Sequence, residues 1–393
     1  MCIRDSVLFT ETLKNRNWKL INTAFQLHQE GCIMPDSYII DVDIFLENAK
    51  KILNEAKKYG IKLYYMTKQI GRNPYLGKKL QEMGYSGVVA VDFREAEIFI
   101  NNNLKIGNVG HLVQIPKNML RKVIKSDPEI ITVYSYEKAE EISEIALELG
   151  KVQDIMLKVV DENSSIYPGQ ESGFEIEGIE EDIRKLLSLK GVNINGLTSF
   201  PCFLYNKEKK RIEPTENIKA VMETKKILKD KFNKEIEQVN LPSATSVENM
   251  KMLSESGGTH GEPGHSLTGT VPMAEDVEIA EPPAYIYVSE ISHNFRGKGY
   301  FYGGGYYRRS NIRKVITGSL EKRCEISVNE MEPNNIDYYL EMQEEGKVGD
   351  TVLGCFRAQI FVTRSEVVLV EGIQSGKPEI IGKYTSLGEK IEK

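Results

Sequence analysis

Residues 61–74, IKLYYMTKQIGRNP, place a lysine directly after a buried strand. Leu63 to Met66 form an apolar and aromatic run that predicts a strand, and a glycine and an Asn-Pro step end it. Lys68 therefore lies at the carboxyl tip of this strand. Burial disfavours an ammonium group and lowers the pKa of a lysine, and the unprotonated amine is the nucleophile needed for a Schiff base. The alternative is a lysine that reaches solvent or a neighbouring carboxylate.

Strand and helix patterns alternate on both sides of this lysine strand. Counted from it, eight β/α units span about 200 residues, which fits a (β/α)8 TIM barrel better than an open doubly wound sheet. The other predicted strands are 37–43, ahead of the count, and 87–92, 106–113, 129–135, 155–160, 192–200, 236–242 and a weaker one near 257–262. Predicted helices include 10–31, 43–59, 135–150 and 179–191.

The pattern changes after the proline pair at 282–283. Four alternating segments follow, with no long helix between them, and predict a separate all-β domain: 284–292, 323–331, 350–364 and 365–373. We expect the barrel over residues 7–275 and the β domain over 276–393. Residues 1–6, MCIRDS, are interpreted as a translated sequencing adapter and are excluded from this division.

Composition narrows the class of protein. The chain has 393 residues, of which 27% are charged, and its formal net charge is -6 with the basic residues spread out. This argues against nucleic acid or an acidic membrane as the main partner. No apolar run approaches the roughly 18 residues of a membrane span, so a cytoplasmic protein is expected. Cys202 and Cys355 lie in apolar runs, and without a CxxC pair or a metal-ligand spacing we expect reduced thiols and no metal site.

The segment LPSATS, residues 241–246, follows a strand and is predicted to open a helix over 246–256. Ser243, Thr245 and Ser246 would present hydroxyl groups beside free helix amides, an arrangement suited to a phosphate. The alternative is an ordinary helix cap.

The segment GEPGHSLTGT, residues 261–270, follows the last predicted strand. Gly261 and Gly264 allow the backbone to approach an anion closely. Glu262 is a carboxylate that could hold a pyridine nitrogen protonated through a charge-assisted hydrogen bond, although a surface turn is the alternative. A lysine, a phosphate cradle and a carboxylate at three strand ends are the parts that pyridoxal 5'-phosphate requires.

The chain resembles the alanine racemase-like, fold-type III pyridoxal phosphate proteins, and most closely the YhfX-like amino acid racemases. The resemblance rests on MTKQIGRNP, GYSGVVAVD, GHLVQIP, YPGQESGF, SATS, EPGHSLTGT, SEISHNFRG, YGGGYYRR and FVTRS. It implies a barrel with a C-terminal β domain, a homodimer with shared active sites, and a small amino acid substrate. It also implies that Lys68 forms the Schiff base with the cofactor.

The resemblance assigns further roles. EPGH is similar to the Glu-Pro-Gly segment of basic amino acid decarboxylases of this fold, whereas alanine racemases usually have arginine where Glu262 stands. A carboxylate there makes the ring a strong electron sink. Tyr302, in YFYGGGYYRR, is the expected second catalytic base, because alanine racemases have a Tyr-Gly segment there. Tyr306 and Tyr300 are the reserve candidates, and Arg308 and Arg309 are the cations expected to lower the tyrosine pKa.

Two positions depart from the family pattern. Ser199 stands where the family commonly has a histidine near the cofactor ring, and the arginine expected after the LKVV strand is absent. The residues that could replace this arginine are Gln170, Glu171 and Lys158. His111 and His265 are expected at barrel-strand ends, where each could contact cofactor or substrate or be a structural histidine.

The leading functional hypothesis is an amino acid racemase. Lys68 and Tyr302 would remove and return the Cα proton on opposite faces of the external aldimine. A decarboxylase or other lyase is the alternative favoured by Glu262. A non-catalytic pyridoxal phosphate carrier is a third possibility, and a barrel without the cofactor is a fourth.

Overall fold

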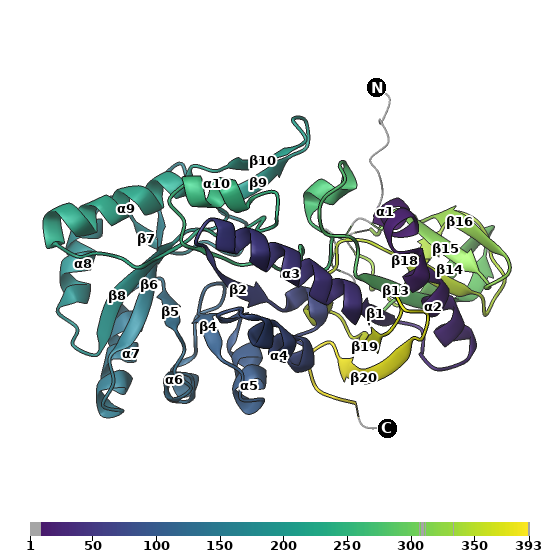
Figure 1. The fold of residues 1–393 in the computed structure, drawn as a ribbon, viewed down its shortest axis with the longest axis horizontal. Helices are drawn as coiled ribbons and strands as arrows, with labels where there is room; N and C mark the ends of the chain where they lie inside the picture. Colours follow the sequence, from purple (N-terminus) through teal and green to yellow (C-terminus); the bar gives the residue numbers. More distant parts are fainter. Residues whose placement is uncertain (1–8, 306, 308–309, 311, 333, 392–393) are drawn as a thin grey trace. The chain divides into compact units, whose positions relative to one another are not determined.

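A computed structural model describes residues 9–305, 307, 310, 312–332 and 334–391. The chain forms two compact units, both drawn in Figure 1. The barrel unit comprises Ile52–Thr67 and Pro74–Gly264, and the β unit comprises Met1–Lys51, Lys68–Asn73 and His265–Lys393.

The barrel unit contains a closed ring of eight parallel strands, as the sequence predicts. The strands pair in the order β5-β4-β3-β2-β12-β11-β8-β6, and β5 pairs with β6 to close the ring. Their bounds are β2 Lys62–Met66, β3 Gly87–Ala90, β4 Ile106–Val109, β5 Ile130–Val133, β6 Gln153–Val160, β8 Val192–Thr198, β11 Gln238–Asn240 and β12 His260–Gly261.

The helices of this unit lie outside the strands, which explains why the strands read as apolar runs (Figure 1). Every residue of β3, β4 and β5 is buried. Side-chain caps start two of the helices, since Asp92 accepts from Glu95 N and Ser135 accepts from Lys138 N. The helices are α4 Pro74–Met83, α5 Phe93–Asn101, α6 Lys117–Lys125, α7 Tyr136–Glu148, α8 Ile179–Leu187, α9 Asn217–Phe232 and α10 Met250–Glu255.

Two short β additions to the barrel were not predicted. Strand β7 (Phe174–Glu175) pairs with the carboxyl end of β6. The hairpin of β9 (Phe203–Asn206) and β10 (Arg211–Pro214) lies between β8 and α9.

The β unit is built on a sheet in the order β16-β15-β18-β13-β1-β19-β20, with β14 pairing with β13 and β17 with β14. The all-β prediction for the C-terminal part is therefore confirmed. The strands are β13 Tyr285–Phe295, β14 Lys298–Tyr302, β15 Lys314–Gly318, β16 Arg323–Ser327, β17 Tyr339–Met342, β18 Thr351–Gly354, β19 Glu366–Glu371 and β20 Glu379–Thr385.

A strand from the start of the chain sits in the middle of this sheet. Strand β1 (Ser37–Asp41) pairs antiparallel with β13 and parallel with β19, and all five of its residues are buried. Helix α3 (Val42–Lys58) follows it. The predicted helical segment 10–31 is two helices, α1 (Phe9–Arg16) and α2 (Trp18–Gln29), whose apolar residues join the core of the β unit.

One predicted strand is shorter than expected. The segment 350–364 is extended only as far as Gly354, and a 3-10 turn, η4 (Ile360–Val362), interrupts the remainder. Within the described ranges, no helix is both long enough and apolar enough to cross a membrane.

Candidate functional site

Lys68 is placed by a sharp change of direction after β2. The strand ends at Met66, and Lys68 opens the 3-10 turn η1 (Lys68–Ile70) as a half-buried residue. Gly71 and Arg72 follow with positive φ angles of 63° and 54°. A side chain on Gly71 would come within 2.7 Å of Val367 on β19, so only glycine allows this close approach.

Lys68 lies near His265 within the β unit. The pKa of His265 is well below its usual value, first because of burial and then because of the positive charges of Arg357 and Lys68. Turn η1 also packs against η4, which begins three residues after Arg357. Lys68, His265 and Arg357 therefore belong to one electropositive cluster.

The hydrogen bonds of His265 determine its tautomer. Arg357 Nε donates to His265 Nε2 at 3.2 Å, and Gln359 Nε2 lies 3.4 Å from the same atom. A guanidinium N–H can only donate, so His265 Nε2 must accept and the ring proton must sit on Nδ1. Nδ1 lies 3.3 Å from Thr270 Oγ1. His265 is therefore a neutral acceptor that orients Arg357, and Arg357 forms no ion pair with any described residue.

Glu262 lies at the end of β12 in the barrel unit and is 5% exposed. Its Oε1 accepts hydrogen bonds from the amides of Asn240 and, at 3.3 Å, Asn108. Its backbone N–H donates to Thr245 Oγ1 at 3.1 Å. Two amides, one from β11 and one from β4, thus hold one carboxylate oxygen in place, and sequence reasoning did not identify either asparagine.

His111 is fully buried in the barrel unit, with Nε2 4.0 Å from Glu262 Oε2. Its ring meets Phe200 edge-to-face at 5.7 Å, and the Tyr134 hydroxyl donates to its backbone carbonyl. The structure therefore brings His111 and Glu262 together, as their positions after β4 and β12 suggest.

The segment 241–246 forms a left-handed turn. Ser243 and Ala244 have positive φ angles of 92° and 52°. The Ser243 hydroxyl donates to Phe203 O at 2.7 Å, and Thr245 Oγ1 accepts from the backbone of Glu262, so both hydroxyl oxygens have partners within the protein.

The helix expected over 246–256 begins later, and this prediction is corrected. Helix α10 starts at Met250, because residues 246–250 form tighter turns with bonds from Asn249 N to Ser246 O and from Met250 N to Val247 O. The Ser246 hydroxyl and both polar atoms of the Asn249 amide are buried without a described hydrogen-bond partner. Buried polar groups of this kind usually bind something.

Glycine is also required beside this turn. A side chain on Gly261 would lie 2.9 Å from Thr245 Cγ2. Hydroxyl and amide donors on a turn with consecutive left-handed residues suit an oxyanion. The residues present therefore fit a phosphate group, and Asn249 is a member that the sequence did not reveal.

Tyr302 ends β14 in the β unit and is half-buried. Its carbonyl accepts a 2.7 Å hydrogen bond from Ser289 Oγ, and its ring lies 5.8 Å from that of Tyr339. Tyr300 donates to Glu341 at 2.7 Å, and this bond raises the Tyr300 pKa, which is unfavourable for a base. Tyr306, Arg308 and Arg309 lie outside the described residues.

Lys158 on β6 is 1% exposed and has a pKa of about 8, because burial disfavours its charged form. Its ammonium donates to Gln170 O at 3.1 Å and Ser172 Oγ at 2.7 Å, and it lies 5.0 Å from the Tyr134 ring centroid. Lys158 thus ties the loop after β6 to the barrel. The contact with Gln170 is through the backbone, and Glu171 acts on Lys158 only through its charge.

Ser199 follows β8 and is fully buried. Its hydroxyl accepts from Asn217 Nδ2 at 3.1 Å. This partner anchors Ser199 within the barrel unit.

Comparison with protein families matches both parts of the chain. Residues 40–272 match the alanine racemase N-terminal domain, and residues 286–380 match the YhfX-like C-terminal domain. The chain is 44% identical over 386 residues to "Uncharacterized protein YhfX" of Escherichia coli (strain K12), covering 98% of this chain and 100% of that protein.

Solved structures share the fold at low identity. D-threonine aldolase from Filomicrobium marinum aligns over 90% of this chain and 94% of its own, with a TM-score of 0.68 and 15% identity. Diaminopimelate decarboxylase from M. jannaschii aligns over 92% of this chain and 92% of its own, with a TM-score of 0.66 and 14% identity. Alanine racemase of Clostridium difficile 630, in complex with cycloserine, aligns over 90% of this chain and 99% of its own, with a TM-score of 0.64 and 17% identity. One fold therefore serves an aldolase, a decarboxylase and a racemase.

Proposed function

This chain belongs to the alanine racemase-like family and has a YhfX-like C-terminal domain, and on that premise we propose that it is a pyridoxal phosphate-dependent amino acid racemase. The observation that carries the proposal is the buried Ser246 hydroxyl and Asn249 amide beside the turn after β11, for which no hydrogen-bond partner is found among the described residues. They follow a strand of the same barrel in which Lys68 follows β2 and Glu262 follows β12.

The cofactor-binding roles follow from the chemistry of each group. Ser246, Asn249 and the backbone of the turn at 243–244 would hold the phosphate, with Thr245 and Gly261 shaping the turn. Lys68 would attach the cofactor covalently through its amine. The Glu262 carboxylate, oriented by Asn108 and Asn240, would accept a hydrogen bond from the ring nitrogen and keep it protonated.

The catalytic roles are proton transfers. Bound pyridoxal phosphate supplies an electron sink for negative charge at the substrate Cα. Lys68 would hold and return the proton on one face of Cα. Tyr302 of a second subunit would do so on the other face, since one lysine reaches only one face. His111 and His265 would be positioning residues.

Arg357 would bind the carboxylate of the amino acid. Its Nε is occupied by His265, while its two terminal nitrogens have no carboxylate among the described residues. A guanidinium fork oriented in this way recognises a carboxylate with two parallel hydrogen bonds. Gln359, whose buried Oε1 has no described partner, is a second polar group of this cluster.

The decarboxylase or lyase reaction is the second candidate, because Glu262 strengthens the electron sink for any reaction at Cα. One experiment separates the possibilities. Purified protein with added cofactor is scanned for absorbance near about 420 nm, and an amino acid panel is then offered in D₂O.

Racemisation predicts deuterium at Cα and loss of optical purity for at least one amino acid. Release of carbon dioxide or an aldehyde would instead establish a lyase. A bound cofactor with no change in any amino acid would indicate a non-catalytic carrier and overturn the racemase proposal.

A further inference from the structure

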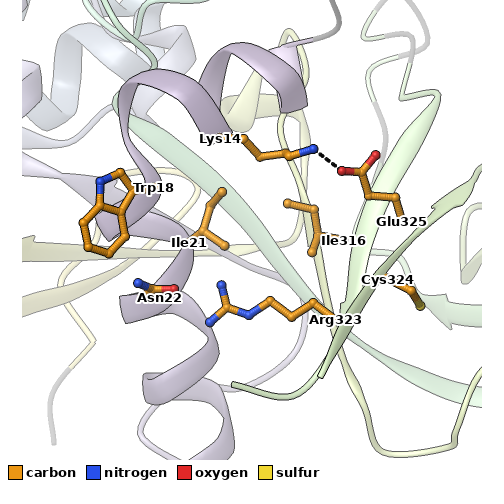
Figure 2. A pocket seen from close by; sticks show the side chains of 8 residues that line it. All are labelled: Lys14, Trp18, Ile21, Asn22, Ile316, Arg323, Cys324 and Glu325. Atoms are coloured by element: carbon orange, nitrogen blue, oxygen red, sulfur yellow. Dashed lines mark hydrogen bonds and ion pairs between the residues drawn. The ribbon is translucent and has the colours of Figure 1, made fainter. Parts of the chain in front are cut away.

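A cavity of about 500 Å³ lies within the β unit, between helices α1 and α2 and strands β15 and β16 (Figure 2). Its residues belong neither to the barrel nor to the Lys68 and Arg357 cluster. The volume falls within the range of small-molecule sites, about 300–1,000 Å³. The lining residues are Lys14, Trp18, Ile21, Asn22, Ile316, Arg323, Cys324 and Glu325.

The cavity has an apolar side. Ile21 of α2 and Ile316 of β15 face each other across it, and Trp18 stands at its edge with 55% of its side chain exposed (Figure 2). Exposed indole rings are uncommon because of their large apolar area. These three side chains would cover the hydrocarbon or aromatic body of a ligand.

The charges around the cavity balance except for one cation. Glu325 pairs with Lys14 and, at 2.9 Å, with Lys314, and Glu11 pairs with Lys14 at 3.0 Å and with Lys314 at 3.6 Å. Two carboxylates therefore neutralise two ammonium groups. Arg323 is the remaining charge, and no carboxylate of the described residues forms an ion pair with it.

The Arg323 guanidinium is held in position. It lies over the buried ring of Phe25, with Cζ 4.4 Å from the ring centroid, and its Nε donates to Ser319 O at 3.4 Å. The side chain extends from β16 toward Asn22 of α2 (Figure 2). Arg323 is an exposed residue of β16, and the partial burial of its guanidinium lowers its pKa. An oriented guanidinium beside an amide is suited to a carboxylate.

We propose that this cavity is a second ligand site that binds a small amphipathic monocarboxylate, with its anion at Arg323 and its apolar body against Trp18, Ile21 and Ile316. The site is independent of the proposed racemase reaction. The occupant is a small molecule because the apolar surface is concave and contains a single uncompensated cation.

The chain itself provides a reporter for this site, since Trp18 is its one tryptophan. The full chain is excited selectively at the indole while 3-phenylpropanoate is added to millimolar concentration. The emission should shift to shorter wavelength and saturate, and quenching by iodide should fall. The neutral analogue 3-phenylpropanamide should bind at least about tenfold more weakly, since it lacks the charge-assisted pair.

Variants test the role of the guanidinium. Arg323→Gln should weaken 3-phenylpropanoate binding about tenfold or more, with Arg323→Lys in between. Arg211→Gln, at an exposed arginine on β10, is the matched control and should bind like the wild type. Circular dichroism verifies folding of each variant.

Four results would overturn the proposal. These are an unsaturable emission change, equal binding of acid and amide, unchanged binding by Arg323→Gln, and a loss of binding in the Arg211 control. Sedimentation velocity adds a fifth, because dissociation of a dimer by Arg323→Gln would show that a second copy covers this surface.

Discussion

The carboxylate of Asp36 occupies the space in which a side chain on Gly304 would have to lie. Asp36 Oδ1 also accepts from Ser365 Oγ and lies 3.1 Å from the Tyr287 hydroxyl, which is 3.0 Å from Tyr302 O. A residue just before β1 thus supports the glycine-rich loop that begins at Tyr302, more than 250 residues later. The loop requires glycine at 304 because this carboxylate packs directly against it.

Asp36 should make stability depend on pH. Burial raises the Asp36 pKa to about 6, whereas the unfolded value is near 4. The folded protein therefore binds the proton more tightly, and stability falls as pH rises from about 4 to about 6 and stays lower above it. Asp36→Asn should remove this part of the pH dependence. The melting temperature of the variant, relative to that of the wild type, should therefore rise between about pH 4 and about pH 7. If the two melting temperatures instead change with pH by the same amount over this range, the ionisation of Asp36 does not lower stability.

Lys68 should carry the cofactor. After borohydride reduction and proteolysis, the pyridoxyl label should map to the peptide containing Lys68, and Lys68→Ala should lose the absorbance near about 420 nm. Lys158 is the informative control, because it is a buried lysine on a barrel strand and burial lowers its pKa to about 8. A label on Lys158 or Lys62 would refute the assignment.

Glu262→Gln should retain the cofactor but slow Cα deuterium exchange at least about tenfold, because a neutral amide holds a pyridinium charge poorly. Glu129→Gln is the matched control. Glu129 is a carboxylate at the amino end of β5, where it binds Tyr64 and Lys105. Its replacement should leave the exchange rate per bound cofactor unchanged, and an equal loss in both variants would point to a general destabilisation of the barrel.

Arg357→Gln should raise KM for the amino acid by about tenfold or more, since one charge-assisted contact to its carboxylate is lost. Cofactor content should stay at the wild-type level. Arg357→Lys keeps the positive charge but loses the forked pair of donors, so its KM should lie between those of the wild type and Arg357→Gln. If Arg357→Gln instead lowers cofactor affinity and leaves KM unchanged, Arg357 binds the phosphate and not the substrate.

Each active site should require two subunits. Inactive Lys68→Ala and Tyr302→Phe chains are mixed under conditions that allow subunit exchange. In a statistical mixture half the dimers are mixed and one of the two sites in each is intact, so activity should recover to about a quarter of wild type. Lack of recovery despite demonstrated exchange would place Tyr302 in its own subunit's site or outside catalysis.

Much of the barrel and part of the site could be predicted from local pattern. The alternation from 62 to 261 predicts eight parallel strands because side-chain period and element length are local properties. Lys68, Glu262 and Ser246 were expected as site residues because polar residues after barrel strands are typical of barrel active sites, and their roles stay predictions. The predicted helix start at residue 246 was wrong, since α10 begins at Met250, because serine and asparagine side chains favour turns over helix in ways that the hydrophobic period does not show.

Long-range pairing decided the rest. Strand β1 has the composition of any buried strand, and only its pairing with β13 and β19 places it in the β unit. Asn108, Asn240 and Asn249 are ordinary residues in the sequence and gain a role only from the side chains they meet after folding. The domain boundaries at 275 and 276, and the shared site, stay predictions.

The sequence by itself determined the class of fold, the strand after which Lys68 lies, and the presence of a carboxylate and hydroxyl groups after two later strands. These depend on periodicity and order along the chain. Only the tertiary structure decided that Arg357 makes His265 a neutral acceptor, that Asp36 packs against Gly304, and that Arg323 lines a cavity without an ion pair to any described carboxylate. Each of these depends on groups far apart in the chain, because their distances and burial after folding set their protonation and partners.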